Sequence, residues 1–187
     1  AGSDASPSCV TIGDCKTGEK VAEYAVVNIK PHDLAVYVSA LGCWFNDAQI
    51  VWEDNGPGQI FGSVLVELGY PCLYHRRREY GAKQGRCDLP GWYCTREAKY
   101  LLLGEYRRAL AMKSFVNRSI RAVDEARQYA HQVDGSVGFS GSDRDDDPSG
   151  AKHNHGDRVI ADALCSLVMT EAATEPAPSV VEPQHCL

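Results

Sequence analysis

The hydrophobic positions in the first part of the chain change their spacing several times, and each change marks a new element. Two short apolar stretches, residues 9–13 and 20–27, flank a polar segment at 14–19, which is typical of a β-hairpin. After Pro31, which suits the first position of a helix, apolar residues recur at helical spacing as far as Phe45. The sequence therefore predicts a hairpin followed by a helix.

A strand, a helix and a second strand are predicted next. Residues 50–53 form a short apolar run that predicts a buried strand, and residues 60–68 have helical spacing closed by Gly69. Residues 71–74 predict another short strand. Two strands joined through a helix form a parallel crossover, so we expect an α/β fold with a mixed central sheet flanked by helices.

The second half of the chain begins with a charged, glycine-containing stretch and then returns to helical spacing. We expect the following segments in order: an excursion at 75–90, a long helix from Thr95, a short strand at 115–116, a helix over 119–129, a loop over 135–150 and a last core helix over 156–169. The proline-containing end is expected to be disordered, which gives one domain over residues 1–170 and a tail over 171–187.

Composition agrees with a single folded domain. The chain has 187 residues and 44% hydrophobic content, enough to bury one core. No apolar run approaches the roughly 18 residues of a membrane helix, and no signal-like segment opens the chain, so we expect a soluble protein. The eight cysteines are irregularly spaced and are expected to be mostly reduced.

Charge is distributed unevenly along the chain, although the formal net charge is only −6. Residues 1–74 carry 3 Lys/Arg against 9 Asp/Glu, residues 75–127 carry 13 against 6, and residues 128–187 carry 3 against 10. A basic middle segment suits a polyanionic partner such as nucleic acid, whereas acidic flanks could supply a cation site. The alternative is an ordinary solvated helix face.

Two acidic positions stand out against this background. The apolar run at 50–53 ends in Glu53, followed by Asp54 and a glycine-rich turn, and such a position lies on the rim of a sheet where ligands bind. Asp157 begins the last apolar helix. Taken singly, these acids could be turn residues or could complement a helix dipole. Together with the basic segment between them, they predict metal-dependent chemistry on a phosphate backbone.

Three local motifs resemble the C-terminal nuclease domain of the phage large terminase subunit. They are Val51-Trp52-Glu53-Asp54-Asn55-Gly56-Pro57-Gly58, Thr95-Arg96-Glu97-Ala98-Lys99-Tyr100 and His155-Gly156-Asp157-Arg158-Val159. The resemblance spans roughly residues 2–169 and implies an RNase H-like fold. The segment Gly2-Ser3-Asp4-Ala5-Ser6 is similar to the end of the family's first core strand, so little of that strand lies upstream, as in a domain excised from a longer protein.

The motif match implies that Asp4, Glu53 and Asp157 are the catalytic, metal-binding acids. Gly156 stands where the family usually has the first acid of a pair, so His155 is expected to take an auxiliary role. The implied cofactor is a pair of Mg²⁺ or Mn²⁺ ions, which can supply an activated water and neutralise charge on a phosphodiester.

The resemblance further implies cutting of concatemeric double-stranded DNA in the cytoplasm of an infected host. Its implied partners are an ATPase domain in the full-length protein, a small terminase subunit and the portal, with no membrane. Arginine forks match phosphate geometry and position DNA without reading sequence. The residues expected to contact DNA are Arg76, Arg77, Arg78, Lys83 and Arg86.

Two alternatives remain open from the sequence. One keeps the fold and changes the substrate: a Holliday-junction resolvase or another RNase H-like nuclease. The other is a non-catalytic nucleic-acid-binding module held together by zinc, for which the candidate ligands are Cys72, His75, Cys87 and Cys94.

Overall fold

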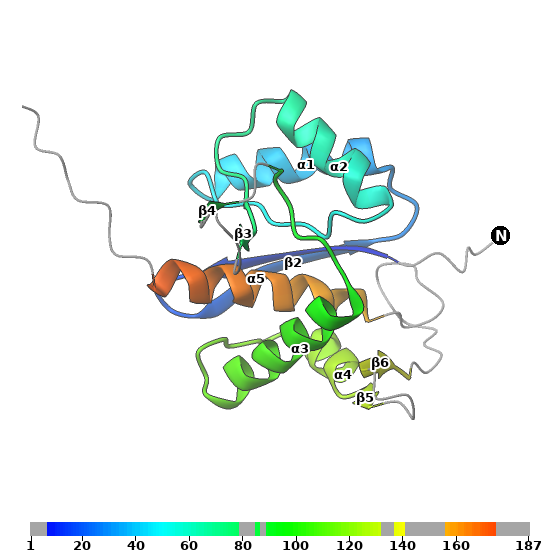
Figure 1. Ribbon diagram of the computed structural model, residues 1–187, viewed down its shortest axis with the longest axis vertical. Coiled ribbons are helices and arrows are strands. Elements are labelled where there is room, and N and C mark those ends of the chain that lie inside the picture. The colour runs from blue at the N-terminus through cyan, green and yellow to red at the C-terminus, as the bar shows by residue number, and fades with distance from the viewer. Residues whose placement is uncertain (1–6, 79–84, 87–88, 132–136, 141–155, 175–187) are drawn as a thin grey trace, which may run out of the picture.

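The computed structural model describes residues 7–78, 85–86, 89–131, 137–140 and 156–174. Its elements are β1 (Ser8–Asp14), β2 (Glu19–Val26), α1 (Pro31–Trp44), α2 (Pro57–Glu67), β3 (Arg77–Arg78), β4 (Gly85–Arg86), α3 (Arg96–Ala111), α4 (Ile120–Ala126), β5 (Tyr129–His131), β6 (Val137–Phe139) and α5 (Asp157–Thr174). In Figure 1, α1 and α2 lie on one side of the β1–β2 ribbon and α5 lies on the other, with α3 and α4 beyond α5.

The predicted hairpin is confirmed as β1 and β2, which pair antiparallel from Ser8 opposite Val26 to Asp14 opposite Glu19. Asp14 shapes the turn, because its carboxylate accepts hydrogen bonds from the Lys16 backbone at 2.9 Å and the Thr17 hydroxyl at 2.9 Å. The odd-numbered residues of β1 face α5, as the bond from Thr11 to Asp162 illustrates.

A short parallel ladder forms around residues 50–54. The Ile50 amide donates to the Cys72 carbonyl at 2.9 Å, and the Tyr74 amide donates to the Ile50 carbonyl at 2.9 Å. Farther along, the Trp92 amide donates to the Trp52 carbonyl at 2.8 Å and the Asp54 amide donates to the Trp92 carbonyl at 2.8 Å. This confirms the predicted parallel crossover through α2.

The charged stretch after residue 75 is an excursion from this ladder, as predicted. The Gly91 amide donates to the Tyr74 carbonyl at 2.8 Å, so the chain returns beside the point where it left. Between the two points, β3 and β4 form a small antiparallel hairpin with Arg77 opposite Arg86. The chain therefore leaves and rejoins the ladder next to the pair formed by Glu53 and Trp92.

Two clusters of buried side chains hold the fold together. One joins α1 and α2 to the residue 50–52 strand, through side chains such as Val38, Leu65 and Trp52. The other joins α3 and α5 through Leu102, Phe115 and Leu164. Each cluster lies on one face of the strands, which is the usual consequence of helices covering both sides of a sheet.

Helix starts follow their sequence signals, but two predicted boundaries are wrong. Thr95 caps α3 by accepting a hydrogen bond from the Ala98 amide at 3.1 Å. The helix predicted over 119–129 stops at Ala126, because Tyr129–His131 form a strand with Val137–Phe139, inside the stretch predicted as loop. The last helix was predicted to end at residue 169 but continues to Thr174, through Ala and Glu residues that favour helix.

The mixed α/β class is confirmed, whereas a continuous RNase H-like central sheet is not formed by the described residues. Their strands make three separate two-stranded sheets and a few isolated parallel bridges. In the same ranges, no helix has the length and apolar character needed to cross a bilayer.

Candidate metal centre

Glu53 and Asp157 lie at the same end of one large cavity. The cavity has a volume of about 910 Å³, and both side chains line it, Glu53 from the end of a strand and Asp157 from the first residue of α5. Burial raises the pKa of the Tyr129 hydroxyl, and the carboxylates of Asp157, Glu125 and Glu53 raise it further. Both predicted acids are therefore close enough to one hydroxyl to act on it electrostatically.

The backbone of the glycine-rich turn holds Glu53 in place. Gly56 has φ 51° and ψ −118°, a conformation that residues with a Cβ rarely adopt. A Cβ at Gly58 would lie 1.8 Å from the Glu53 carbonyl oxygen, so only glycine allows the first turn of α2 to pack this closely on the strand. Asn55 ties the turn to the segment around Cys94, because its side chain accepts a hydrogen bond from the Cys94 amide at 2.7 Å and donates one to the Cys94 carbonyl at 3.2 Å.

The two adjacent acids at the strand end have different surroundings. The Trp52 indole donates to the Asp54 carboxylate at 3.2 Å, and Asp54 does not line the cavity. Glu53 does line it, and beside Glu53 lies Cys94, whose pKa is raised to about 11 by burial and by the Glu53 carboxylate. Cys94 is therefore a neutral thiol at neutral pH, and Glu53 is the acid that faces the cavity.

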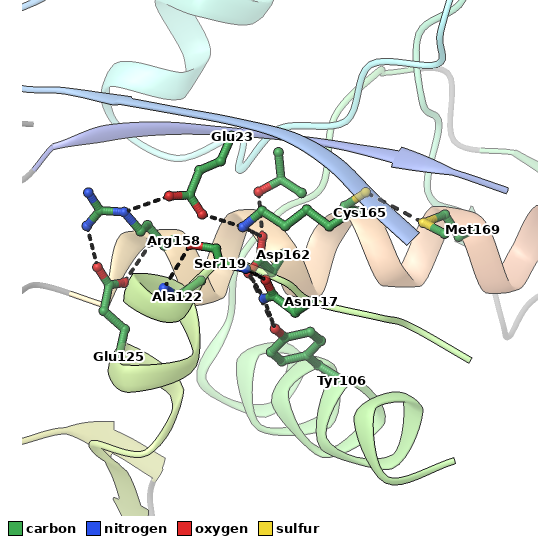
Figure 2. Close-up of polar contacts among 12 residues, drawn as sticks. Glu23, Tyr106, Asn117, Ser119, Ala122, Glu125, Arg158, Asp162, Cys165 and Met169 are labelled. Atoms are coloured by element: carbon green, nitrogen blue, oxygen red, sulfur yellow. Dashed lines mark hydrogen bonds and ion pairs between the residues drawn. The ribbon is translucent and has the colours of Figure 1, made fainter. Parts of the chain in front are cut away.

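Asp157 is positioned by its neighbour Arg158, which is buried at 2% exposure. Figure 2 shows the Arg158 guanidinium between two carboxylates: it donates to Glu125 at 2.6 Å and to Glu23 at 3.2 Å. The Arg158 backbone amide also donates to Glu125, at 3.1 Å. The first turn of α5 is thus tied to both α4 and β2.

A second part of the same polar network fixes the middle of α5. Asp162, fully buried, accepts hydrogen bonds from Lys20 at 2.6 Å, Thr11 at 2.5 Å and Asn117 at 2.6 Å. Burial raises the pKa of Asp162, opposed by the charge and hydrogen bond of Lys20. For Glu23, burial alone would raise the pKa, but the Lys20 hydrogen bond and charge outweigh it and the pKa is lowered.

Tyr129 is a site residue that sequence reasoning missed. Gly156 has φ 74°, and a Cβ there would lie 2.6 Å from the Tyr129 hydroxyl oxygen. The same hydroxyl donates to the Gly156 carbonyl at 3.1 Å. The tyrosine therefore occupies the space of a side chain at residue 156, where the motif comparison expects an acid. No sequence signal marked Tyr129, because it approaches Gly156 only through the pairing of β5 with β6.

The remaining predicted site residues are only partly described. Asp4, His155 and Lys83 lie outside the described residues. Arg77, Arg78 and Arg86 belong to the β3–β4 hairpin. Arg76 is exposed at the base of the excursion, where its guanidinium donates to the Tyr93 carbonyl at 3.4 Å.

The described part of the chain contains no group of three or more His, Cys, Asp or Glu residues that could hold a metal ion. Of the predicted acidic triad, it contains Glu53 and Asp157. Of the alternative zinc ligands, Cys72 packs against the α1–α2 cluster and Cys94 packs against the α3–α5 cluster. Cys87 lies outside the described residues.

No protein-family model matches this sequence, and no curated protein matches it. Among solved structures, the chain is similar to the crystal structure of the large terminase nuclease from thermophilic phage G20c with bound cobalt. The two share 15% sequence identity over 85% of this chain and 73% of the other, with a TM-score of 0.61. The fold is that of a terminase nuclease. The resemblance read from the three motifs is confirmed at the level of the fold.

Proposed function

We propose that this chain is a divalent-metal-dependent endonuclease domain of a viral DNA-packaging terminase, and that it cuts concatemeric double-stranded DNA. The observation that carries the proposal is that Glu53 and Asp157 line one cavity and that both carboxylates act electrostatically on the Tyr129 hydroxyl. The fold shared with the phage G20c terminase nuclease, whose solved structure holds cobalt, supports it. In that reading, the strands belong to an RNase H-like sheet.

The two acids suit a hard cation. Carboxylate oxygens are the ligands that Mg²⁺ and Mn²⁺ prefer, and Glu53 and Asp157 come from elements whose positions are fixed. We assign Asp4 as the third acid and His155 as an auxiliary ligand, with two ions in the complete site. Two bound cations would supply an activated water and neutralise charge on the phosphodiester during an in-line displacement.

The chain's own contribution is orientation. Asn55 and the glycines of the turn aim Glu53, while Arg158 and Glu125 hold the start of α5 and with it Asp157. The raised pKa of Tyr129 keeps its hydroxyl protonated, so it remains a donor to the Gly156 carbonyl at the edge of the site. Fixed carboxylates preserve a reactive geometry that flexible ones would lose.

DNA contacts are assigned to the basic excursion, through Arg76, Arg77, Arg78, Lys83 and Arg86. The excursion begins and ends beside the bridge between His75 and Gly91, next along the ladder from Glu53 and Trp92. A duplex bound along it would therefore pass the acidic end of the cavity. The wider partners follow from the proposed role: an ATPase domain, a small terminase subunit and the portal, in the host cytoplasm.

The basic excursion can be tested by salt dependence. Replacing Arg76, Arg77 and Arg78 with alanine should weaken duplex binding at every sequence, because fewer counterions are released. The slope of log affinity against log salt should fall by up to about 0.9 for each phosphate contact removed. Alanine at Arg107 and Arg108, exposed on α3, is the matched control and should leave the slope unchanged. An unchanged slope in the triple variant would place the DNA groove elsewhere.

The nuclease proposal itself is tested by nicking of supercoiled plasmid with and without Mg²⁺ or Mn²⁺. Cutting should require the metal and stop with chelator. Undiminished cutting in excess chelator would exclude the metal-dependent mechanism. Preferential symmetric cutting of a four-way junction would instead favour a resolvase. Stoichiometric zinc in protein purified without added metal, with no cutting, would favour the zinc-held binding module.

A further inference from the structure

The peptide groups on both sides of Asp157 are held by side chains from outside α5. The Gly156 carbonyl, which belongs to the peptide before Asp157, accepts a hydrogen bond from the Tyr129 hydroxyl at 3.1 Å. The Arg158 amide, which belongs to the peptide after Asp157, donates to the Glu125 carboxylate at 3.1 Å. Because each peptide group is planar, holding both planes fixes the two backbone dihedral angles of Asp157.

These two contacts act at a helix end that has no cap of its own. Gly156 precedes Asp157, the first residue of α5, and glycine has no side chain with which to cap a helix. By contrast, α3 and α4 follow Thr95 and Ser119, whose side chains accept hydrogen bonds from amides of the first turn. In α5, the helical bond from the Ile160 amide to the Gly156 carbonyl is long, at 3.4 Å. The direction of Asp157 therefore depends on neighbours outside α5.

Glu125 and Tyr129 are held at a fixed separation by the segment that joins them. Glu125 lies in the last turn of α4, and Tyr129 is the first residue of β5. Between them, the Gln128 amide donates to the Glu125 carbonyl at 3.0 Å. The Gln128 carbonyl accepts from the Ser140 amide at 3.0 Å and from the Ser140 hydroxyl at 2.9 Å. Both contacts on α5 thus come from one short segment with its own hydrogen bonds.

The ring of Tyr129 is fixed by its partner across the small β5–β6 sheet. Tyr129 lies opposite Phe139, and the two ring centroids are 5.4 Å apart. Together the rings close around Gly156: a Cβ there would lie 2.6 Å from the Tyr129 hydroxyl oxygen and 2.9 Å from the Phe139 ring. Glycine at residue 156, with φ 74°, therefore allows the tyrosine to reach the backbone before Asp157.

Tyr129 is a neutral donor in acidic surroundings. Burial raises the pKa of its hydroxyl, and the carboxylates of Asp157, Glu125 and Glu53 raise that pKa further, so the hydroxyl keeps its proton at neutral pH. A lysine or arginine in the same place would pair with these carboxylates and repel a cation. A phenol holds the backbone and leaves the charge of Glu53 and Asp157 available to a metal ion.

We propose that Tyr129 is a positioning residue of the metal centre: together with Glu125 it holds the backbone on both sides of Asp157 and so sets the direction of the Asp157 carboxylate. The allowed rotamers of a side chain depend on φ and ψ, so a fixed backbone restricts where the carboxylate points. This role rests on the proposed nuclease function, because it assigns Asp157 to a divalent cation. Groups that orient a metal ligand from outside the coordination shell change metal affinity by about 10–100-fold when they are removed.

The test removes one hydroxyl and keeps the ring, by Tyr129→Phe, so the packing against Gly156 is preserved. Tyr70→Phe is the matched control, because the Tyr70 hydroxyl also donates to a backbone carbonyl, that of Ala48 at 2.7 Å, and also packs over a glycine, Gly42. The Mn²⁺ affinity of the 187-residue chain is measured without DNA, by titration followed with electron paramagnetic resonance. The affinity should fall at least about tenfold in Tyr129→Phe and stay within about twofold of wild type in Tyr70→Phe.

A second readout needs no metal. Hydrogen exchange at the Arg158 amide reports local opening of the first turn of α5. In metal-free protein this exchange should become faster in Tyr129→Phe, whereas exchange of amides in the middle of α5 should change much less. A general loss of stability would instead speed exchange along the whole helix, so the comparison separates a local restraint on Asp157 from a merely structural role of Tyr129.

Equal Mn²⁺ affinity in wild type and Tyr129→Phe would overturn the positioning role. An equal loss of affinity in Tyr70→Phe, or equally faster exchange along all of α5 in Tyr129→Phe, would overturn it too, because the tyrosine would then act through stability alone. Failure of the nuclease proposal looks different: the wild-type chain itself would bind no Mn²⁺ and cut no plasmid. That result precedes any substitution, and the positioning role would fall with it.

Discussion

The two acids that line the cavity, Glu53 and Asp157, are held by different kinds of interaction. Glu53 is held by backbone geometry: the strand ladder, the left-handed Gly56 and the close approach of Gly58 to the Glu53 carbonyl. Asp157 is held by buried charge, through the Arg158 guanidinium between Glu125 and Glu23. The second arrangement, drawn in Figure 2, joins α4, α5 and β2. The first consists of one glycine-rich turn and the adjacent strand ladder.

The difference decides which substitutions should disturb each half of the site. A site held by close backbone packing is sensitive to added atoms, because there is no room for them. A site held by a buried ion pair is sensitive to removed charge, because the remaining partner is left uncompensated in a poorly solvated place. The following experiments separate these two modes.

The largest expected effect is on catalysis, from Asp157→Asn. The change removes a charge and almost no volume, so the fold should persist. A metal-bound carboxylate contributes several kcal/mol to stabilising the transition state, so plasmid nicking should fall by about 10³-fold. Glu53→Gln should behave in the same way.

Asp54→Asn is the matched control for both variants. Asp54 neighbours Glu53 but does not line the cavity, and asparagine keeps an oxygen acceptor for the Trp52 indole. Nicking should remain near the wild-type rate. Retained nicking in Asp157→Asn would remove that residue from the metal centre, even if the fold comparison stands.

Glu125→Ala should produce the largest loss of stability. It removes one carboxylate partner of the Arg158 guanidinium, whose residue is 2% exposed. Removing one member of a buried pair costs about 3 kcal/mol at the lower end of the usual range, measurable as a lower urea midpoint at constant slope. Glu105→Ala breaks an exposed pair with Arg108 and should cost at most about 0.5 kcal/mol. Equal losses in the two variants would mean that Arg158 is not held by charge.

Gly58→Ala tests the backbone-held half. The added Cβ would lie 1.8 Å from the Glu53 carbonyl oxygen, so the start of α2 or the strand end must shift. Overpacking of this kind costs about 2 kcal/mol, and the displaced Glu53 should also reduce nicking. Gly104→Ala is the control: nothing lies within 4 Å of its Cβ position inside α3, so alanine should stabilise by about 0.5–1 kcal/mol. An unchanged urea midpoint in Gly58→Ala would show that the turn is not tightly packed.

Features that depend on residues close in the sequence were predicted well from local sequence patterns. The hairpin, the Thr95 cap, the strand ending at Glu53 and the parallel crossover all depend on residues close in sequence, and all are found. The hydrophobic spacing of α5 also predicted its place in the core, although Asp162 lies fully buried within that helix. The hydrogen bond that Asp162 accepts from Lys20 could not be predicted, because the two residues are separated by 142 positions.

The predictions that were wrong depend on contacts between segments that are distant in the sequence. Tyr129 was expected at the end of a helix, yet pairing with residues 137–139 places it against Gly156. The glycine in the third motif was interpreted as a missing ligand, whereas in the structure it makes room for the tyrosine ring. The assignment of Asp4, Glu53 and Asp157 as a metal triad remains a prediction, as does the DNA-binding role of the basic excursion.

The smallest expected effect concerns pH and distinguishes the two carboxylates that share Arg158. The pKa of Glu23 is lowered in the folded protein by Lys20, despite burial, so its contribution to stability is present above the ordinary value of 4.5 and is lost as pH falls through the lowered pKa. Burial raises the pKa of Glu125, so the folded state favours the protonated form of this carboxyl. The contribution of Glu125 to stability is therefore present below pH 4.5 and is lost as pH rises through the raised pKa. Urea unfolding across this range should therefore show opposite trends: the stability gap between wild type and Glu23→Gln widens with rising pH, and the gap between wild type and Glu125→Gln narrows. If both stability gaps changed in the same direction with pH, the pKa values of Glu23 and Glu125 would be shifted in the same direction, and the opposite shifts assigned to them would be wrong.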